Sequence, residues 1–487
     1  MVLEKKEKSK KLKSKCYCYM LQCSNHAYYT GWTTDISRRV KQHQSGRGSN
    51  YTKMNSPVEL VYWETHKTNQ IARKREISIK KMTHQMKKNI AHGNNHVEDD
   101  TKNFAKYEYF VSSPGRVNLL GEHVDYNGGP VLPVAIDRSV SLWANKQDDE
   151  LFSIKTIDLN LEVIFSLESL ERKLDIHGAR MPDWALYPAS VIWAAVKNQL
   201  TVSGFDAIFS SNVPIGAGLS SSAAVEIGFA ALLREICNWQ IDDTQLALLC
   251  QTAENDYVGV NCGIMDQFAC ANGVDNAALY LNTSSMKWYP VPLPEDVILI
   301  IADSKVKRAL ASSAYNERRE SCNQALKIMR QYLPTINCLA DINPDQLKNF
   351  GKSLSEVTYK RAKHVVDECQ RVEQAVEFLK NGDIVSFGRL MREGHESLRD
   401  LYEVSIPEID ILVDLANQSQ DCFGSRLTGA GFGGCTVSIV TKEKSDEFIQ
   451  YLKSGYFKLT DKDINVYKCK ARTGVFVEWR KINQSQN

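Results

Sequence analysis

A dense polar segment near residue 120 carries side chains that could bind a polyhydroxylated ligand. Residues 113–129 hold Arg116, Glu122, His123 and Asp125 between small turn residues, with few apolar positions for a core to bury. Carboxylates accept hydrogen bonds from sugar hydroxyl groups, while His and Asn side chains can accept or donate them. An ordinary polar loop is the alternative. So many polar side chains packed between glycines favour a sugar-binding loop.

A glycine- and serine-rich segment, residues 214–223, lies between a predicted strand (205–210) and a predicted helix (224–236). Glycines let the backbone approach a ligand closely, and free N–H groups at a helix start attract phosphate. The segment lacks the Lys-Ser/Thr pair of a Walker A loop. Capping would explain one serine but not three, so we expect a phosphate-binding loop whose hydroxyls could also bind Mg²⁺. Its candidate residues are Gly216, Gly218, Ser220, Ser221 and Ser222.

A third glycine segment, residues 427–435, matches the spacing of the dinucleotide-binding fingerprint through Gly429, Gly431 and Gly434. The fingerprint requires a strand, a turn and then a helix. Here the residues that follow, 436–440, are typical of a strand. A Rossmann-type dinucleotide site is therefore excluded.

Composition predicts a soluble globular protein. The chain has 487 residues, 43% hydrophobic and 24% charged, a length typical of about three domains. No apolar run approaches the roughly 20 residues that a membrane span needs, and the run 297–302 is better interpreted as a buried strand. Thirteen cysteines without a CxxC pair favour reduced thiols, and so a cytoplasmic protein.

Charge divides the chain into two modules. Residues 1–96 hold 20 basic and 6 acidic side chains, whereas the remainder holds 40 and 52, giving net charges of +14 and −12. A basic module of this size suggests a nucleic acid or another polyanion as partner. For the lysines between residues 5 and 15, a merely solvated tail is the alternative.

The boundaries of the modules follow from composition. We expect a basic disordered tail over residues 1–14, a small domain over 15–88 and a polar linker over 89–104. His84, His92 and His96 lie near this linker, but no Cys or carboxylate spacing supports a metal site there.

The three glycine-bearing segments, together with residues 262–268 and 311–319, closely resemble the signature motifs of galactokinases. These belong to the superfamily named for galactokinase, homoserine kinase, mevalonate kinase and phosphomevalonate kinase. The resemblance runs from about residue 104 to 479. It implies an α+β, two-lobed sugar kinase with lobes at 105–290 and 291–487 and its site between them. The implied reaction transfers the ATP γ-phosphoryl group to the 1-hydroxyl of galactose, with Mg²⁺.

The resemblance also implies roles for individual residues. Asp266 resembles the carboxylate that takes the proton of the sugar 1-hydroxyl, and Arg116 the arginine that stabilises the developing charge. Ser222 and Glu254 match the pair that positions Mg²⁺, and Trp184 resembles a tryptophan beside the adenine. Alternatively, Trp184 is a tryptophan of the core and Glu254 is a carboxylate on a helix surface. Positions that match sugar-binding residues are Glu122, His123, Asp125, Gly263 and Tyr315.

The basic module has a different arrangement of polar residues. Two tyrosine-bearing strands are followed by a helix with arginines (35–43), a strand (58–63) and a helix with one glutamate among basic residues. A tyrosine can activate water, an arginine can stabilise charge and a glutamate can hold one Mg²⁺. This combination suits metal-assisted phosphodiester cleavage.

This module resembles the GIY-YIG nuclease domain. Tyr19 and Tyr29 match the two motif tyrosines, Arg39 the catalytic arginine and Glu76 the metal-binding glutamate, while His43 falls where members carry Tyr or His. The first half of the motif reads Tyr-Cys-Tyr at 17–19, and Trp32 replaces a smaller or basic residue. DNA is the implied partner. A degenerate nuclease fold that only binds nucleic acid is the alternative.

Several alternatives stay open. The kinase could act on N-acetylgalactosamine or another sugar, or it could be a non-catalytic sugar sensor. In a third alternative, the nuclease-like module is the physiologically important half of the chain. The intact serine run, Arg116 and Asp266 argue against the sensor. We expect a monomer or weak oligomer. A genuine fusion and an artificial join of two reading frames would give the same sequence.

Overall fold

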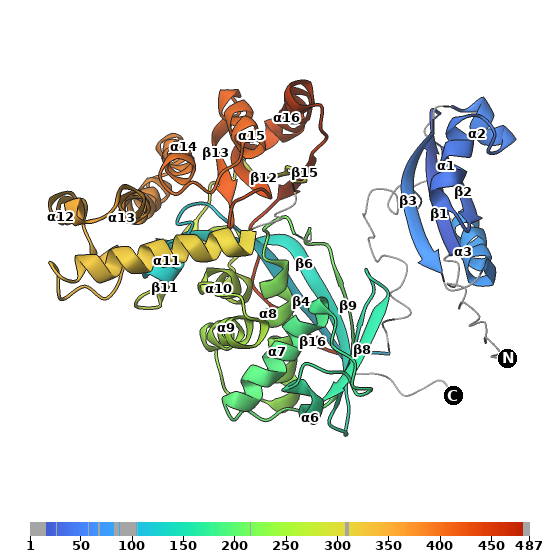
Figure 1. Ribbon diagram of the computed structural model, residues 1–487, viewed down its shortest axis with the longest axis horizontal. Helices are drawn as coiled ribbons and strands as arrows, with labels where there is room; N and C mark the ends of the chain where they lie inside the picture. The colour runs from blue at the N-terminus through green and yellow to red at the C-terminus, as the bar shows by residue number, and fades with distance from the viewer. Residues whose placement is uncertain are drawn as a thin grey trace, which may run out of the picture. The chain divides into compact units, whose positions relative to one another are not determined.

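The computed structural model describes residues 16–25, 27–56, 58–66, 69–81, 87, 104, 106–214, 216–306 and 311–480. Two compact units make up the chain, residues 1–103 and 104–487, and each is described by itself (Figure 1). The predicted basic tail, 1–14, and residues 89–103 of the predicted linker, 89–104, fall outside the described residues. Helices and strands occur together in both units, so the predicted α+β class is confirmed.

The first unit is a three-stranded antiparallel sheet, ordered β2-β1-β3, with helices on both faces (Figure 1). Side chains alternate across a strand. Tyr19 and Leu21 of the central strand therefore pack against α1, while Cys18 and Met20 pack against Ile79 of α3. The elements are β1 (Cys16–Cys23), β2 (Tyr28–Thr33), α1 (Ile36–Gln44), α2 (Asn50–Met54), β3 (Val58–His66) and α3 (Asn69–Lys81).

The N-terminal part of the second unit is built on a six-stranded sheet ordered β16-β4-β6-β9-β7-β8, covered on one face by α7 to α10 (Figure 1). The strands are β4 (Tyr109–Asn118), β6 (Pro133–Lys146), β7 (Leu151–Thr156), β8 (Leu161–Ser166), β9 (Phe205–Ser211) and β16 (Phe476–Trp479). The helices are α6 (Leu167–Leu170), α7 (Asp183–Lys197), α8 (Ser221–Cys237), α9 (Asp243–Thr252) and α10 (Met265–Asn272).

The C-terminal part contains a four-stranded antiparallel sheet, ordered β13-β14-β12-β15. Leu299 and Ile301 of the central strand β12 pack against α13 and α14, whereas Ile298 and Ile300 pack against α15 and α16. Burial on both faces explains why residues 297–302 form a continuous apolar run, as predicted. The strands are β12 (Val297–Asp303), β13 (Cys422–Thr428), β14 (Cys435–Thr441) and β15 (Asn465–Cys469).

The helices of this part are α11 (Ala311–Met329), α12 (Pro344–Phe350), α13 (Glu356–Lys380), α14 (Ile384–Asp400), α15 (Pro407–Gln418) and α16 (Ser445–Thr460). A smaller sheet, ordered β11-β10-β5, joins β5 (Pro130–Val131), β10 (Ala277–Asn282) and β11 (Lys287–Pro292). Within the described ranges, no helix is long and apolar enough to cross a lipid bilayer.

Two local predictions bear directly on the site. A strand, β14, follows the third glycine segment, so the strand predicted at 436–440 is confirmed and the helix that the dinucleotide fingerprint requires does not follow. The helix after the second segment begins at Ser221, three residues before the predicted start. Ser220 caps it in a left-handed conformation (φ 56°, ψ 46°), and its carbonyl accepts a hydrogen bond from the Ala224 N–H. The early start brings the last serines of the run into the first helical turn.

Candidate active site

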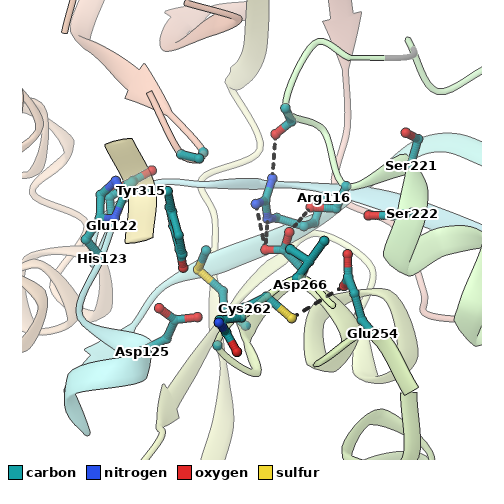
Figure 2. Close-up of a pocket in the computed structure, with 18 of the residues that line it drawn as sticks. Arg116, Glu122, His123, Asp125, Ser221, Ser222, Glu254, Cys262, Asp266 and Tyr315 are labelled. Carbon is teal, nitrogen blue, oxygen red and sulfur yellow. Dashed lines mark hydrogen bonds and ion pairs between the residues drawn. The ribbon is translucent and has the colours of Figure 1, made fainter. Parts of the chain in front are cut away.

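A cavity of about 350 Å³ in the second unit gathers the polar residues of the glycine-bearing segments (Figure 2). All of the predicted kinase site residues except Trp184 line it. These residues are Arg116, Glu122, His123, Asp125, Gly216, Gly218, Ser220, Ser221, Ser222, Glu254, Gly263, Asp266 and Tyr315. Gly429 and Ala430 of the third segment also line the cavity.

Arg116 and Asp266 occupy the middle of the cavity (Figure 2). The guanidinium of Arg116 binds Asp266 Oδ1 through Nε at 2.8 Å and Nη2 at 2.6 Å, and it donates from Nη1 to the Gly218 carbonyl at 2.7 Å. Ser220 Oγ donates to the other carboxylate oxygen, Oδ2, at 2.5 Å. The buried arginine thus ties the Asp266 carboxylate to the glycine-serine loop.

The glycine-serine loop takes a conformation that turns its backbone toward the cavity. Gly216 and Gly218 have φ values of 75° and 82°, a region that is costly for residues with a side chain. Ser220 adopts the same region without being a glycine. The loop leads into the 17-residue helix α8, whose first N–H groups have no intrahelical acceptor. Such a helix start suits an anionic phosphate group.

Glu122 and His123 form the opposite end of the cavity (Figure 2). Glu122 is 1% exposed, and Arg426 approaches its Oε2 atom at 2.7 Å, while its Oε1 atom has no hydrogen-bond partner among the described residues. Burial raises the pKa of Glu122 to about 7, and the charge of Arg426 opposes that rise. Burial lowers the pKa of His123 to about 3, and its Nε2 atom is also unpartnered within the described part. Two polar atoms are therefore available to a ligand.

Asp125, Gly263 and Tyr315 complete this end. A Cβ atom at Gly263 would overlap the Asp125 carboxylate, so only glycine fits beside it. Burial and the charge of Asp266 raise the pKa of Asp125 to about 6. The ring of Tyr315, on α11, lies 5.5 Å from the His123 ring.

Glu254 lies beside the start of α8, in a π-helical turn (Ala253–Val258). Burial and the charge of Asp266 raise its pKa to about 7, and Ser222 hydrogen-bonds to it. Gln267 Nε2 donates to Glu254 Oε2 at 2.5 Å and to Glu226 Oε2 at 3.1 Å. A carboxylate and a hydroxyl next to a phosphate-binding loop are ligands that suit Mg²⁺ shared with phosphate oxygens. The described residues contain no group of three or more His, Cys, Asp and Glu that could hold a metal alone.

The predicted adenine-side residue, Trp184, lies on α7 outside the cavity lining. Its ring lies 6.0 Å from that of Phe209, and its indole Nε1 is buried without a partner in the described ranges. An unpartnered indole N–H could donate to a nucleotide, so its predicted role remains a prediction.

The buried residues that support the side chains lining the cavity were not predicted from the sequence. Arg426 is fully buried and bridges Glu122 to Glu368 of α13, whose Oε1 atom lies 2.9 Å from Arg426 Nη1. Gln267 similarly bridges two carboxylates, because its Nε2 atom donates to both Glu254 and Glu226. The only signal for Arg426 in the sequence is that it is the single charged residue of the segment 422–428. Glu368 and Glu226 lie on long helices without a distinguishing pattern.

In the first unit, the predicted residues Tyr19, Tyr29, Arg39 and His43 form one cluster. Tyr19 Oη lies 2.8 Å from His43 Nε2 and accepts a hydrogen bond from Arg39 Nε at 3.3 Å. The Tyr29 and His43 rings lie 4.9 Å apart. Burial raises the pKa of Tyr19 to about 12, although Arg39 opposes the rise. A Cβ atom at Gly31 would lie 2.6 Å from Tyr19 Oη, so this glycine makes room for the cluster.

Glu76 comes from α3 on the same unit. Its charge reaches Tyr19, whose pKa it raises slightly, and Lys80 holds its carboxylate at 2.7 Å. Trp32, which departs from the expected motif, lies under the guanidinium of Arg73 at 4.6 Å. The departure thus introduces a cation–π contact between β2 and α3.

Models of four protein families match the chain. A galactokinase galactose-binding signature matches residues 101–146, the N-terminal domain of GHMP kinases matches 187–274, and the C-terminal domain matches 375–458. A GIY-YIG catalytic domain matches residues 15–89.

Relatives and solved structures agree with these matches. A galactokinase of Roseiflexus sp. is 44% identical over 75% of this chain and 92% of its own length, and one of Fusobacterium nucleatum is 41% identical over 76% and 95%. The structure of a Lactococcus lactis galactokinase complexed with galactose has a TM-score of 0.73 and 32% identity, covering 77% of this chain and 98% of the other. A Streptococcus pneumoniae phosphomevalonate kinase shares the fold, with a TM-score of 0.51 and 15% identity over 74% and 98%.

Proposed function

This chain belongs to the galactokinase family, and we propose that it transfers the γ-phosphoryl group of ATP to the 1-hydroxyl of galactose, giving galactose 1-phosphate and ADP. The observation that carries the proposal is the contact chain from Asp266 through Arg116 to the Gly218 carbonyl. It links a carboxylate beside the polar sugar loop to a loop suited to phosphate, inside one cavity. Both reactants of such a transfer could meet there.

The sugar end supports a polyol substrate. The unpartnered Glu122 Oε1 can accept a hydrogen bond from a hydroxyl group, and His123 Nε2 can accept or donate one. Asp125 and Tyr315 add further polar atoms at the same end, and the absence of a side chain at Gly263 makes room for the Asp125 carboxylate. We infer that these residues orient galactose with its 1-hydroxyl toward Asp266.

The nucleotide end supports ATP with Mg²⁺. The phosphates would be bound by the N–H groups at the start of α8, together with the segment at Ser220 and Ser221. Ser222 and Glu254 would hold Mg²⁺, which when bound offsets phosphate charge during phosphoryl transfer. Trp184 remains our candidate for a residue beside the adenine.

Asp266 and Arg116, in the middle of the cavity, would accept the proton and stabilise the developing negative charge. Asp266 would take the proton of the sugar 1-hydroxyl as its oxygen attacks phosphorus. The guanidinium of Arg116, which is 4% exposed, would keep the carboxylate in place and stabilise negative charge on the reacting oxygens. Ser220 donates to Oδ2 while Arg116 holds Oδ1, and these contacts restrain the rotation of the carboxylate.

An ADP-release assay with a panel of sugars tests the proposal. We expect turnover with galactose and Mg-ATP, and much less with N-acetylgalactosamine or glucose. Turnover preferring N-acetylgalactosamine would reassign the chain to a sister sugar-1-kinase. Galactose binding without ADP release from any sugar would favour a sensor.

We propose a second function for the first unit, nucleic-acid binding, supported by the Tyr19, Arg39 and His43 cluster and the basic charge of residues 1–96. Cleavage additionally requires Glu76 to release Lys80 and bind Mg²⁺. We further propose the domain boundaries 15–88, 105–290 and 291–487, a cytoplasmic location and a monomer or weak oligomer.

A further inference from the structure

Gln267 follows Asp266 in the first turn of α10 and joins two carboxylates inside the second unit. Its side chain is fully buried, and its Nε2 atom donates to Glu254 Oε2 at 2.5 Å and to Glu226 Oε2 at 3.1 Å. An amide nitrogen carries two protons, so each contact can use one of them. The phosphoryl transfer proposed above gives no role to Gln267 or to Glu226.

The two contacts determine which end of the Gln267 amide faces the carboxylates. Ionised carboxylates only accept hydrogen bonds, so the amide oxygen cannot replace the nitrogen between them. Glu226 is also fully buried, and two neighbouring carboxylates repel each other. Because they share one donor atom, Gln267 fixes where Glu254 lies relative to Glu226.

This bridge connects the two elements that carry the proposed Mg²⁺ ligands. Ser222 and Glu226 both lie on α8, four residues apart, so they occupy the same face one turn from each other. Glu254 comes instead from the π-helical turn, where the Gly259 N–H donates to the Glu254 carbonyl at 2.9 Å. The contact of Gln267 with Glu226 therefore ties Glu254 to the helix that carries Ser222.

The orientation of the Glu254 carboxylate is restrained at one oxygen. Cys262 Sγ also donates to Oε2, at 3.4 Å, so Gln267 and Cys262 both hold this atom. Figure 2 shows the other oxygen of Glu254 pointing toward the side of the cavity on which Ser222 lies. Mg²⁺ requires nearly ideal octahedral geometry, so the spacing of its oxygen ligands matters more than for a larger cation.

We propose that Gln267 is a positioning residue for the cation, because its bridge to Glu226 fixes the spacing and orientation of Glu254 relative to Ser222. The inference rests on the proposed function for the identity of the cation, Mg²⁺ bound with the nucleotide. Consecutive helical residues point about 100° apart. One turn of α10 thus directs Asp266 toward Arg116 and Gln267 toward Glu254, and so sets the base and the metal carboxylate together.

Binding measurements without sugar test the proposal in the full-length protein. Gln267→Met keeps the length of the side chain and removes both N–H donors. We expect the Mn²⁺ affinity of its ADP complex, measured by electron paramagnetic resonance, to fall about 10- to 100-fold, as is typical when a residue that orients a metal ligand is lost. ADP affinity in EDTA, measured by calorimetry, should not change. Gln324→Met, on the exposed face of α11, is the control and should leave both affinities unchanged.

A second variant covers the case in which Gln267→Met does not fold. Gln267→Asn keeps both donors on a side chain one methylene shorter, so it should displace Glu254 and also weaken Mn²⁺ binding. Thermal unfolding identifies the temperatures at which each variant is folded, and affinities are compared there. Unchanged Mn²⁺ affinity in a folded Gln267 variant would overturn the proposal.

A double-variant cycle shows whether Gln267 acts through Glu254. Glu254→Gln removes the charged ligand, so adding Gln267→Met to it should cause little further loss of Mn²⁺ affinity. Losses that add in the double variant would contradict a positioning role. A wild-type ADP affinity that is equal in Mn²⁺ and in EDTA would overturn this inference together with the metal site. Failure to phosphorylate galactose would contradict only the proposed kinase function, since these measurements need no turnover.

Discussion

Arg426 and Glu122 form a fully buried ion pair between the two parts of the second unit, with 2.7 Å between Nη2 and Oε2. The guanidinium also contacts Glu368, which binds Arg371 at 2.6 Å and accepts a hydrogen bond from the Gly121 N–H. Two carboxylates and two guanidiniums therefore neutralise one another. This network holds one oxygen of Glu122 and leaves the other for a ligand.

The first prediction concerns this pair. Arg426→Met should leave Glu122 and Glu368 buried without their shared cation and destabilise the protein by about 3–5 kcal/mol. In protein that still folds, galactose KM should rise more than ATP KM. Thermal unfolding and steady-state kinetics measure the two effects, and Arg389→Met, on the exposed face of α14, is the control. Equal effects on both substrates would contradict a role through Glu122.

The second prediction concerns the central carboxylate. Asp266→Asn keeps the shape and removes the proton acceptor, so kcat should fall about 10²- to 10⁴-fold. Galactose binding measured by calorimetry should persist. Asp256→Asn changes an exposed carboxylate nearby and should leave both kcat and galactose binding unchanged. Near-normal turnover in Asp266→Asn would exclude it as the base.

The third prediction concerns the metal. Glu254→Gln removes a charged oxygen ligand while keeping a partner for Gln267, so the Mg²⁺ concentration for half-maximal rate should rise by more than the galactose KM does. A Mg²⁺ titration at saturating ATP measures this. An unchanged Mg²⁺ dependence would assign Glu254 a structural role only.

The fourth prediction concerns pH. Burial raises the pKa of Glu122 to about 7 and that of Asp125 to about 6, both above their unfolded values. Their contribution to stability is therefore fully present below about pH 4 and is lost as the pH rises through 6 to 7. Galactose needs both groups as acceptors, so its binding near pH 6 should release protons and weaken as the pH falls.

Calorimetry in two buffers with different ionisation enthalpies measures this release. We expect a buffer-dependent binding enthalpy at pH 6 that disappears at pH 8.5. Glu122→Gln cannot titrate and should reduce the release. A buffer-independent enthalpy at pH 6 would show that neither carboxylate gains or loses a proton on binding.

The sequence could predict the parts of the site that lie in contiguous loops. The segments around Arg116, Ser220 and Asp266 carry their chemistry in adjacent residues, and they meet in one cavity as their resemblance implied. Arg426 could not be assigned in this way, because its partners are more than fifty residues away and only the packing of β13 against α13 and α14 brings them together. The start of α8 was also missed, because Ser220 reaches a left-handed conformation that propensity does not favour.

The last prediction is that the full-length chain binds DNA through its first unit in a salt-dependent way. Residues 1–96 carry a net charge of +14, and Arg39 lies against Tyr19 at the centre of the cluster. Phosphate contacts release counterions, so the logarithm of affinity should fall with the logarithm of salt concentration, with a slope of about −0.9 per phosphate neutralised on duplex DNA.

Variants separate binding from cleavage. Arg39→Ala should weaken binding and reduce the slope by about one if its guanidinium contacts a phosphate, whereas Glu59→Ala, an exposed carboxylate on β3, should not weaken it. Glu76→Ala should preserve binding and abolish any Mg²⁺-dependent nicking of branched or linear DNA. Binding without nicking in the wild type would identify a nucleic-acid-binding module whose Glu76 stays paired with Lys80. Affinity that does not change with salt would show that the charge of this unit contacts no phosphate.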